Sequence, residues 1–247
     1  MKRVLVVQHA WEDPPGTLGE IMQEQGILFD TVKVEEGDAL PGLTGYDAFV
    51  ILGGPQHAAD DHVHLYLAQE KDLIRQAVAQ DIPLLGVCLG GQLLAHTMGA
   101  PLQRDAMIEI GFYEAYLTAE GQHDPLFQGL PATQQVFHWH ADTFEVPVGG
   151  VLLATGDNAS KQAFRLGRRA YGLQYHIELT PDMFDTWIHF HPHRQDAIET
   201  LGLERYTKIE QERSVRYPVY REHMGILFKN FLSIGERNNS CVHNSYY

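Results

Sequence analysis

The sequence has few cysteines and no long apolar run. Its 247 residues contain two cysteines, Cys88 and Cys241, and the second lies in the polar stretch RNNSCVHNSYY. A structural disulfide between them is not expected, and a reducing, cytoplasmic location fits the composition. No segment approaches the roughly 18 apolar residues of a membrane span. The start, MKRVLVVQHAWEDPP, predicts a first strand and not a signal peptide.

Positive charge and nucleotide-binding loops are also scarce. The chain has 18 Lys and Arg against 32 Asp and Glu, which gives a formal net charge of −14. That balance argues against affinity for nucleic-acid phosphates or anionic membranes, so we expect neither as a partner. The patterns GxxxxGK[ST] and SGGVDS do not occur, so the chain lacks a recognisable loop for binding a nucleotide phosphate.

What the first half does contain is short apolar runs that alternate with helical patterns. Residues 4–7, 48–52 and 83–87 are nearly continuous in apolar side chains, as parallel strands buried on both faces are. Residues 17–26 and 65–80 have helical spacing. Together they predict an α/β fold with a doubly wound sheet.

The second half predicts a mixed sheet followed by helices. Its strand-like runs, which are shorter and interrupted by Gly, Pro and Asp, cover residues 112–118, 134–138, 151–155, 162–165 and 170–176. A helix is expected to begin with Thr180 as its N-cap and Pro181 in its first position. We expect one domain over residues 1–200. Residues 201–247 are expected to form a C-terminal helical appendage, helical from about 203 to 233, with a polar tail.

The segment GVCLGGQLLA at residues 86–95 is the most informative part of the chain. It places Cys88 on a sharp turn between an apolar run and a helical pattern, with glycines where side chains would clash, as in a nucleophile elbow. The helix behind Cys88 supplies free N–H groups and a positive dipole end, which can hold an oxyanion. The alternative interpretation is a buried structural cysteine.

A thiol nucleophile needs a base, and the segment YGLQYHIE offers one. His176 ends a predicted strand and Glu178 follows two residues later, so both side chains should share a face. Glu178 could then orient the imidazole and stabilise its protonated form. A purely structural polar pair at a strand end is the alternative.

Five short segments of the sequence together resemble a known family. GGP at 53–55, GVCLGGQ at 86–92, EIG at 109–111, HWHADTFEVP at 138–147 and GLQYHIE at 172–178 have the order and spacing of class I glutamine amidotransferase domains. The resemblance covers residues 1–190 and is strongest to free-standing proteins related to the glutaminase half of GMP synthetase. It implies a flavodoxin-like fold and a cysteine-dependent enzyme, without any cofactor.

The resemblance also implies a role for seven residues. Cys88 would be the nucleophile, His176 the general acid and base, and Glu178 its orienting partner. The backbone N–H groups of Gly54 and Leu89 would bind the oxyanion, whereas Gln92 and the backbone around Gly111 would bind the substrate. The implied reaction releases ammonia from the γ-carboxamide of glutamine through a γ-glutamyl thioester. Because nucleotide-binding loops are absent, a synthetase or other acceptor enzyme would be a partner, and homo-oligomers are left open.

Two other functions are compatible with the same residues. Gly91 stands where the family commonly has a bulky residue, which predicts a roomier pocket and keeps a γ-glutamyl peptide or amide hydrolase open. A non-catalytic, redox-responsive protein of the same fold is the second alternative.

We expect the histidine-rich segments to have structural roles and not to bind metal. We expect no metal at His138 and His140, since that run matches a family segment near the active site. His189, His191 and His193 are spaced by two, so on a helix they would not converge on an ion.

Overall fold

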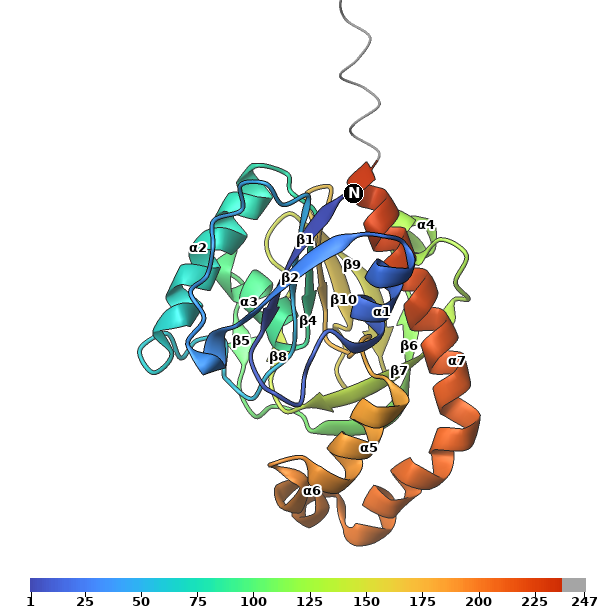
Figure 1. The fold of residues 1–247 in the computed structure, drawn as a ribbon. Helices are drawn as coiled ribbons and strands as arrows, with labels where there is room; N and C mark the ends of the chain where they lie inside the picture. The colour runs from blue at the N-terminus through green and yellow to red at the C-terminus, as the bar shows by residue number, and fades with distance from the viewer. Residues whose placement is uncertain (237–247) are drawn as a thin grey trace, which may run out of the picture.

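A nine-stranded sheet runs through the molecule in the order β2-β1-β3-β4-β11-β10-β9-β6-β7 (Figure 1). The computed structural model describes residues 1–236. The parallel strands are β1 Arg3–Gln8, β2 Leu28–Lys33, β3 Ala48–Ile51, β4 Leu84–Val87 and β11 Ala170–Leu173. The antiparallel ones are β6 Glu109–Leu117, β7 Thr133–His140, β9 Gly150–Gly156 and β10 Ala163–Leu166. The predicted mixed, doubly wound α/β fold is therefore confirmed.

Helices cover both faces of this sheet. The helices are α1 Gly16–Glu24, α2 Leu65–Ala79, α3 Leu89–Thr97, α4 Ala119–His123, α5 Pro181–Phe190, α6 Arg194–Leu201 and α7 Leu203–Glu236. Apolar side chains of α2 and α3 pack on one face, and those of α1, α5 and α7 pack on the other. Short elements complete the chain: a two-stranded sheet of β5 Leu102–Gln103 and β8 Thr143–Phe144, and the 3-10 turns Val34–Glu36 and Pro125–Phe127. None of the helices in residues 1–236 has the length and apolarity needed to cross a bilayer.

The helix α7 runs the whole height of the molecule beside β6 and β7 (Figure 1). Its buried side chains, such as Tyr220, Phe228 and Phe231, belong to the same core cluster as the sheet. Near its end, a Cβ on Gly235 would lie 2.1 Å from the side chain of Met1, so the helix finishes against the start of the chain. The domain boundary at residue 200 stays a proposal, and the expected polar tail with Cys241 lies outside the described residues.

The local sequence determines where α5 begins but not where β11 ends. Thr180 caps α5, since its hydroxyl accepts a hydrogen bond from Met183 N at 3.2 Å and Pro181 occupies the first turn, as predicted. In contrast, β11 ends at Leu173, so His176 lies three residues beyond the strand that was expected to contain it. An isolated bridge to Phe137 holds His176 there instead.

The N-terminus of α3 lies directly on the sheet because glycines let backbones touch. A Cβ on Gly90 would lie 2.2 Å from Ile51 O, and one on Gly91 would lie 2.5 Å from Leu173 O. The expectation that Gly91 widens a substrate pocket is therefore wrong, since its missing side chain would point at β11. Only glycine allows this approach.

We expect Gly91→Ala to lower the free energy of unfolding by about 1–3 kcal/mol, because the added methyl group must displace backbone. Urea-induced unfolding followed by circular dichroism measures the change. Gly225→Ala in α7 is the matched control, since a Cβ there meets nothing within 4 Å and should stabilise the helix by about 0.5–1 kcal/mol. Equal stabilities of Gly91→Ala and the unsubstituted protein would contradict the packing described.

Candidate active site

Three neighbouring strands deliver the predicted groups to one edge of the sheet. Gly54 follows β3, Cys88 follows β4 and His176 follows β11, and these strands are adjacent and parallel. Their carboxyl ends therefore meet at the crevice where α/β folds commonly bind ligands. The fourth neighbour, β1, adds the loop that follows Gln8.

Cys88 has the backbone of a nucleophile elbow. Its φ of 50° and ψ of −105° lie in a region that side chains other than glycine rarely occupy. Its N–H donates to Leu173 O at 2.9 Å, which fixes the turn to β11. The side chain is buried, with Sγ 3.9 Å from Trp139 O. The sulfur therefore has a defined position at the start of α3.

His176 and Glu178 form a buried pair beside Cys88. Nδ1 of His176 donates to Oε1 of Glu178 at 2.6 Å, and Oε2 accepts from the N–H of Ile177 at 2.7 Å. The other ring nitrogen, Nε2, is buried and has no hydrogen-bond partner within the described residues. Burial lowers the pKa of His176, but Glu178 and Cys88 outweigh it and hold that pKa well above its usual range.

The remaining predicted residues divide between two places. Gly54 and Gln92 line a cavity with Cys88 and His176. Leu89 is the first residue of α3, so its N–H has no acceptor within the helix. Gln92 donates from Nε2 to Asp142 O at 3.1 Å. Gly111 does not line this cavity: it lies against Ile209 in a groove beside α7, whereas Ile108 and Ile110, which precede it, reach the cavity.

The cavity has a volume of about 360 Å³. Its walls include Trp139, Trp187 and His191, whose ring stacks on that of Trp139 with centroids 4.2 Å apart. Burial lowers the pKa of His191 to about 4, helped by the nearby His193 and His176. Segments from α5 and α6 therefore close one side of the site. His189, His191 and His193 do not share one helix, because α5 ends at Phe190 and α6 begins at Arg194.

Sequence reasoning missed the loop after β1. His9 is fully buried; its Nε2 lies 2.9 Å from Oε2 of Glu70 and its Nδ1 lies 3.2 Å from Gly53 O. This pair supports the turn that carries Gly54. Glu12 and Asp13 follow and line the cavity. Their position after the first parallel strand, at the carboxyl edge of the sheet, is the signal that could have identified them.

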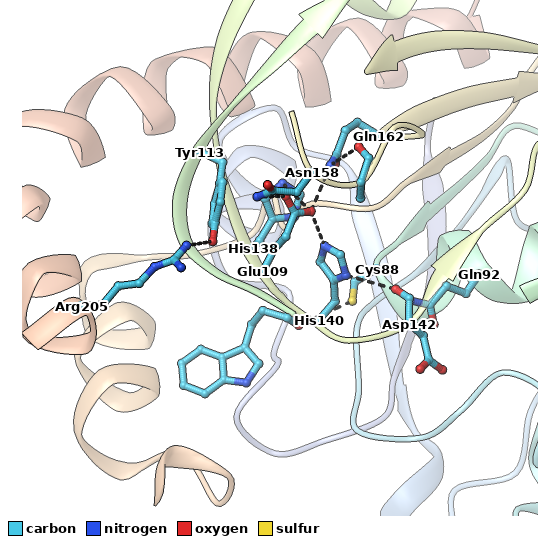
Figure 2. A network of polar contacts seen from close by, with 12 residues as sticks. Cys88, Gln92, Glu109, Tyr113, His138, His140, Asp142, Asn158, Gln162 and Arg205 are labelled. Carbon is cyan, nitrogen blue, oxygen red and sulfur yellow. Dashed lines mark hydrogen bonds and ion pairs between the residues drawn. The ribbon is translucent and has the colours of Figure 1, made fainter. Parts of the chain in front are cut away.

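A second polar network, centred on Glu109, adjoins the cavity through His140, which lines it (Figure 2). Glu109 accepts hydrogen bonds from His140 at 2.9 Å, Gln162 at 3.2 Å and Asn158 at 3.3 Å. Burial alone would raise the pKa of Glu109, but these histidine and amide partners lower it to about 2. Ligand atoms of Glu109, His138 and His140 lie within 4.8 Å of one another, so this is where side chains could hold a metal ion. The other nitrogen of His140 contacts Asp142 O at 3.1 Å, so the network also fixes the loop that bonds Gln92.

Fold and site together define the class of protein. The sequence model of the glutamine amidotransferase class-I family matches residues 22–193, and the chain belongs to this family. Among its relatives, a glutamine amidotransferase-like protein, YfeJ of Salmonella typhimurium, is 27% identical over 90% of this chain and 94% of its own length. A subunit of the glutamine-hydrolysing GMP synthase of Archaeoglobus fulgidus is 31% identical over 68% of this chain and 82% of its own length.

Solved structures agree with this assignment. A glutamine amidotransferase from Thermotoga maritima is 29% identical and superposes with a TM-score of 0.80 over 95% of this chain and 98% of that one. One from Methylobacillus flagellatus is 25% identical, with a TM-score of 0.81 over 95% of both chains.

We expect Glu178→Gln to lower the pKa of His176. Burial, which favours the neutral ring, remains in this variant, whereas the carboxylate that stabilises the imidazolium is lost. Titration of the histidine ring signals by NMR measures the change, with Glu210→Gln as an exposed control near His189. An unchanged His176 titration would show that Glu178 does not stabilise the charged ring.

Proposed function

We propose that the protein hydrolyses the γ-carboxamide of glutamine through a thioester on Cys88, with His176 as general acid and base and Glu178 as its orienting partner. One observation carries this proposal: the strained elbow of Cys88 shares a cavity with His176. The Nδ1 of that histidine is hydrogen-bonded to a buried carboxylate, and its Nε2 has no hydrogen-bond partner in the part of the chain that the structure describes. A buried structural cysteine needs none of these features.

The geometry supports the following steps. The sulfur of Cys88 attacks the amide carbon while its proton passes to Nε2 of His176, and the C=O electrons move onto oxygen. The N–H groups of Gly54 and Leu89 would bind that oxyanion. Collapse of the intermediate breaks the C–N bond, and the His176 proton goes to the departing nitrogen as ammonia forms. Water, deprotonated by His176, then attacks the thioester and releases glutamate and the thiol.

The fate of the ammonia is part of the same proposal. The chain spans about a quarter of the full-length GMP synthase of Spiroplasma kunkelii, which it matches at 30% identity. It spans most of the GMP synthase subunit of Archaeoglobus fulgidus. We therefore propose a separate synthetase-type enzyme as the acceptor partner. We also propose a cytoplasmic location, where a reducing environment keeps Cys88 as a thiol.

A γ-glutamyl amide hydrolase is the second candidate. The argument from Gly91 no longer supports it, but the cavity reaches beyond Cys88 to His191, which lies between α5 and α6, and to Thr200 of α6. Its volume of about 360 Å³ falls within the range of pockets that take whole small-molecule ligands. A substituent on the amide nitrogen therefore has room.

We expect Cys88→Ala to reduce ammonia and glutamate release from L-glutamine by about 10³-fold or more, because Cys88 is the only thiol among residues 1–236 and a thioester needs a thiol. His176→Asn should cause a loss of the same order. A coupled glutamate dehydrogenase assay measures turnover, and mass spectrometry of rapidly quenched protein detects the γ-glutamyl adduct on Cys88.

The control is His189→Asn, which changes an exposed histidine outside the cavity and should retain activity. Undiminished turnover by a folded Cys88→Ala protein would overturn the proposed mechanism. Iodoacetamide labelling of Cys88 that glutamine does not slow, together with absent turnover, would favour the redox-responsive alternative.

A further inference from the structure

We infer that Glu12 and Asp13 form an anionic subsite for the leaving group, and that the substrates it favours are γ-glutamyl amides of short diamines, whose far end carries an ammonium group. This inference rests on the proposed function, because it concerns the amine that departs when Cys88 is acylated. It names the class of that amine.

The two carboxylates are built into the cavity wall. Both residues are 5% exposed and line the same cavity as Cys88. The loop that carries them is pinned on two sides: Trp187 donates from Nε1 to Glu12 O at 2.9 Å, and Thr17 N donates to Glu178 O at 2.8 Å. Their position is therefore fixed by α5 and by the start of α1.

One oxygen of the Asp13 carboxylate lacks the partner that a buried carboxylate normally has, among the residues that the structure describes. Its Oδ1 has no hydrogen-bond partner within residues 1–236, and the lining described for this cavity offers no lysine or arginine. Burial raises the pKa of Asp13 to about 7, with neighbouring His176 acting in the opposite direction and Glu178 and Glu12 adding to the rise. A buried carboxylate without a partner is costly, and a bound cation would remove that cost.

Asp13 lies on the side from which the amine leaves. A Cβ placed on Gly53 would be 2.8 Å from Cε1 of His176 and 3.6 Å from Oδ2 of Asp13, so both side chains flank this glycine. His176 must reach the departing nitrogen to protonate it. A substituent on that nitrogen therefore extends past His176, toward the loop of Glu12 and Asp13.

The other charged residues that line the cavity favour a positively charged substituent. No lysine or arginine lines the cavity within the described residues, whereas Asp105, Asp142 and Asp196 also border it. A leaving group that ends in a carboxylate, as in a γ-glutamyl peptide, would meet these like charges and would find no lysine or arginine of the lining to pair with. The indole walls of Trp139 and Trp187 suit a methylene chain between the amide nitrogen and the far ammonium.

Steady-state hydrolysis of matched amides tests this inference. The probes are L-glutamine and the γ-glutamyl amides of 1,4-diaminobutane and of n-pentylamine, its uncharged isostere. We expect kcat/KM to be at least about tenfold higher for the charged amide than for the uncharged one. Asp13→Asn should reduce kcat/KM for the charged amide about tenfold and change that for the pentylamide less than about twofold. Glu12→Gln should act in the same direction.

The matched control is Asp196→Asn, a side chain that borders the cavity but is 75% exposed, where solvent screens its charge and the preference should persist. Equal kcat/KM values for the two alkylamides, or turnover of glutamine alone, would overturn the inference and leave the proposed function intact. Equal losses on both amides in Asp13→Asn would make Asp13 a positioning residue of His176 and would also overturn it. A wild-type protein that hydrolyses none of the probes would overturn the proposed function itself.

Discussion

The strained backbone of Cys88 is the constraint on which the site depends. A cysteine keeps a positive φ only where its surroundings leave no alternative. Here the N–H of Cys88 is bonded to Leu173, and the glycines that follow place α3 against β3 and β11. The three strands that position the sulfur also position Gly54 and His176, because each group follows one of them. Core packing and site geometry are therefore the same set of contacts.

The site gathers carboxylates whose environments differ. Glu178 and Glu109 are buried but fully engaged by histidine and N–H or amide donors. Asp13 is also buried, and its Oδ1 has no such donor among the described residues. A carboxylate thus orients a histidine at Glu178 and holds a loop in place at Glu109. In our inference, the carboxylate of Asp13 binds a ligand.

Periodicity and local signals predicted much of the fold. The apolar runs of β1, β3 and β4, the helical spacing of α2 and the cap at Thr180 depend on neighbours in sequence, so the sequence alone revealed them. The end of β11 was misjudged because the bridge to Phe137, a residue distant in sequence, decides it. Strand β2 was missed because its run LFDTVK is mostly only partly buried and interrupted by polar residues. The orientation of Gly91 and the burial of His9 and Asp13 also follow from long-range packing, which one sequence does not display.

The path of α7 brings the two ends of the described chain together, which makes a circular permutant possible. It begins beside α6, the helix whose Thr200 lines the cavity, and ends against Met1, at the opposite end of the molecule (Figure 1). Residues 1 and 236 therefore lie close together and far from the cavity. A short linker could join these two points in a circular permutant, with new ends opened in a surface loop, and the cavity would keep its full wall.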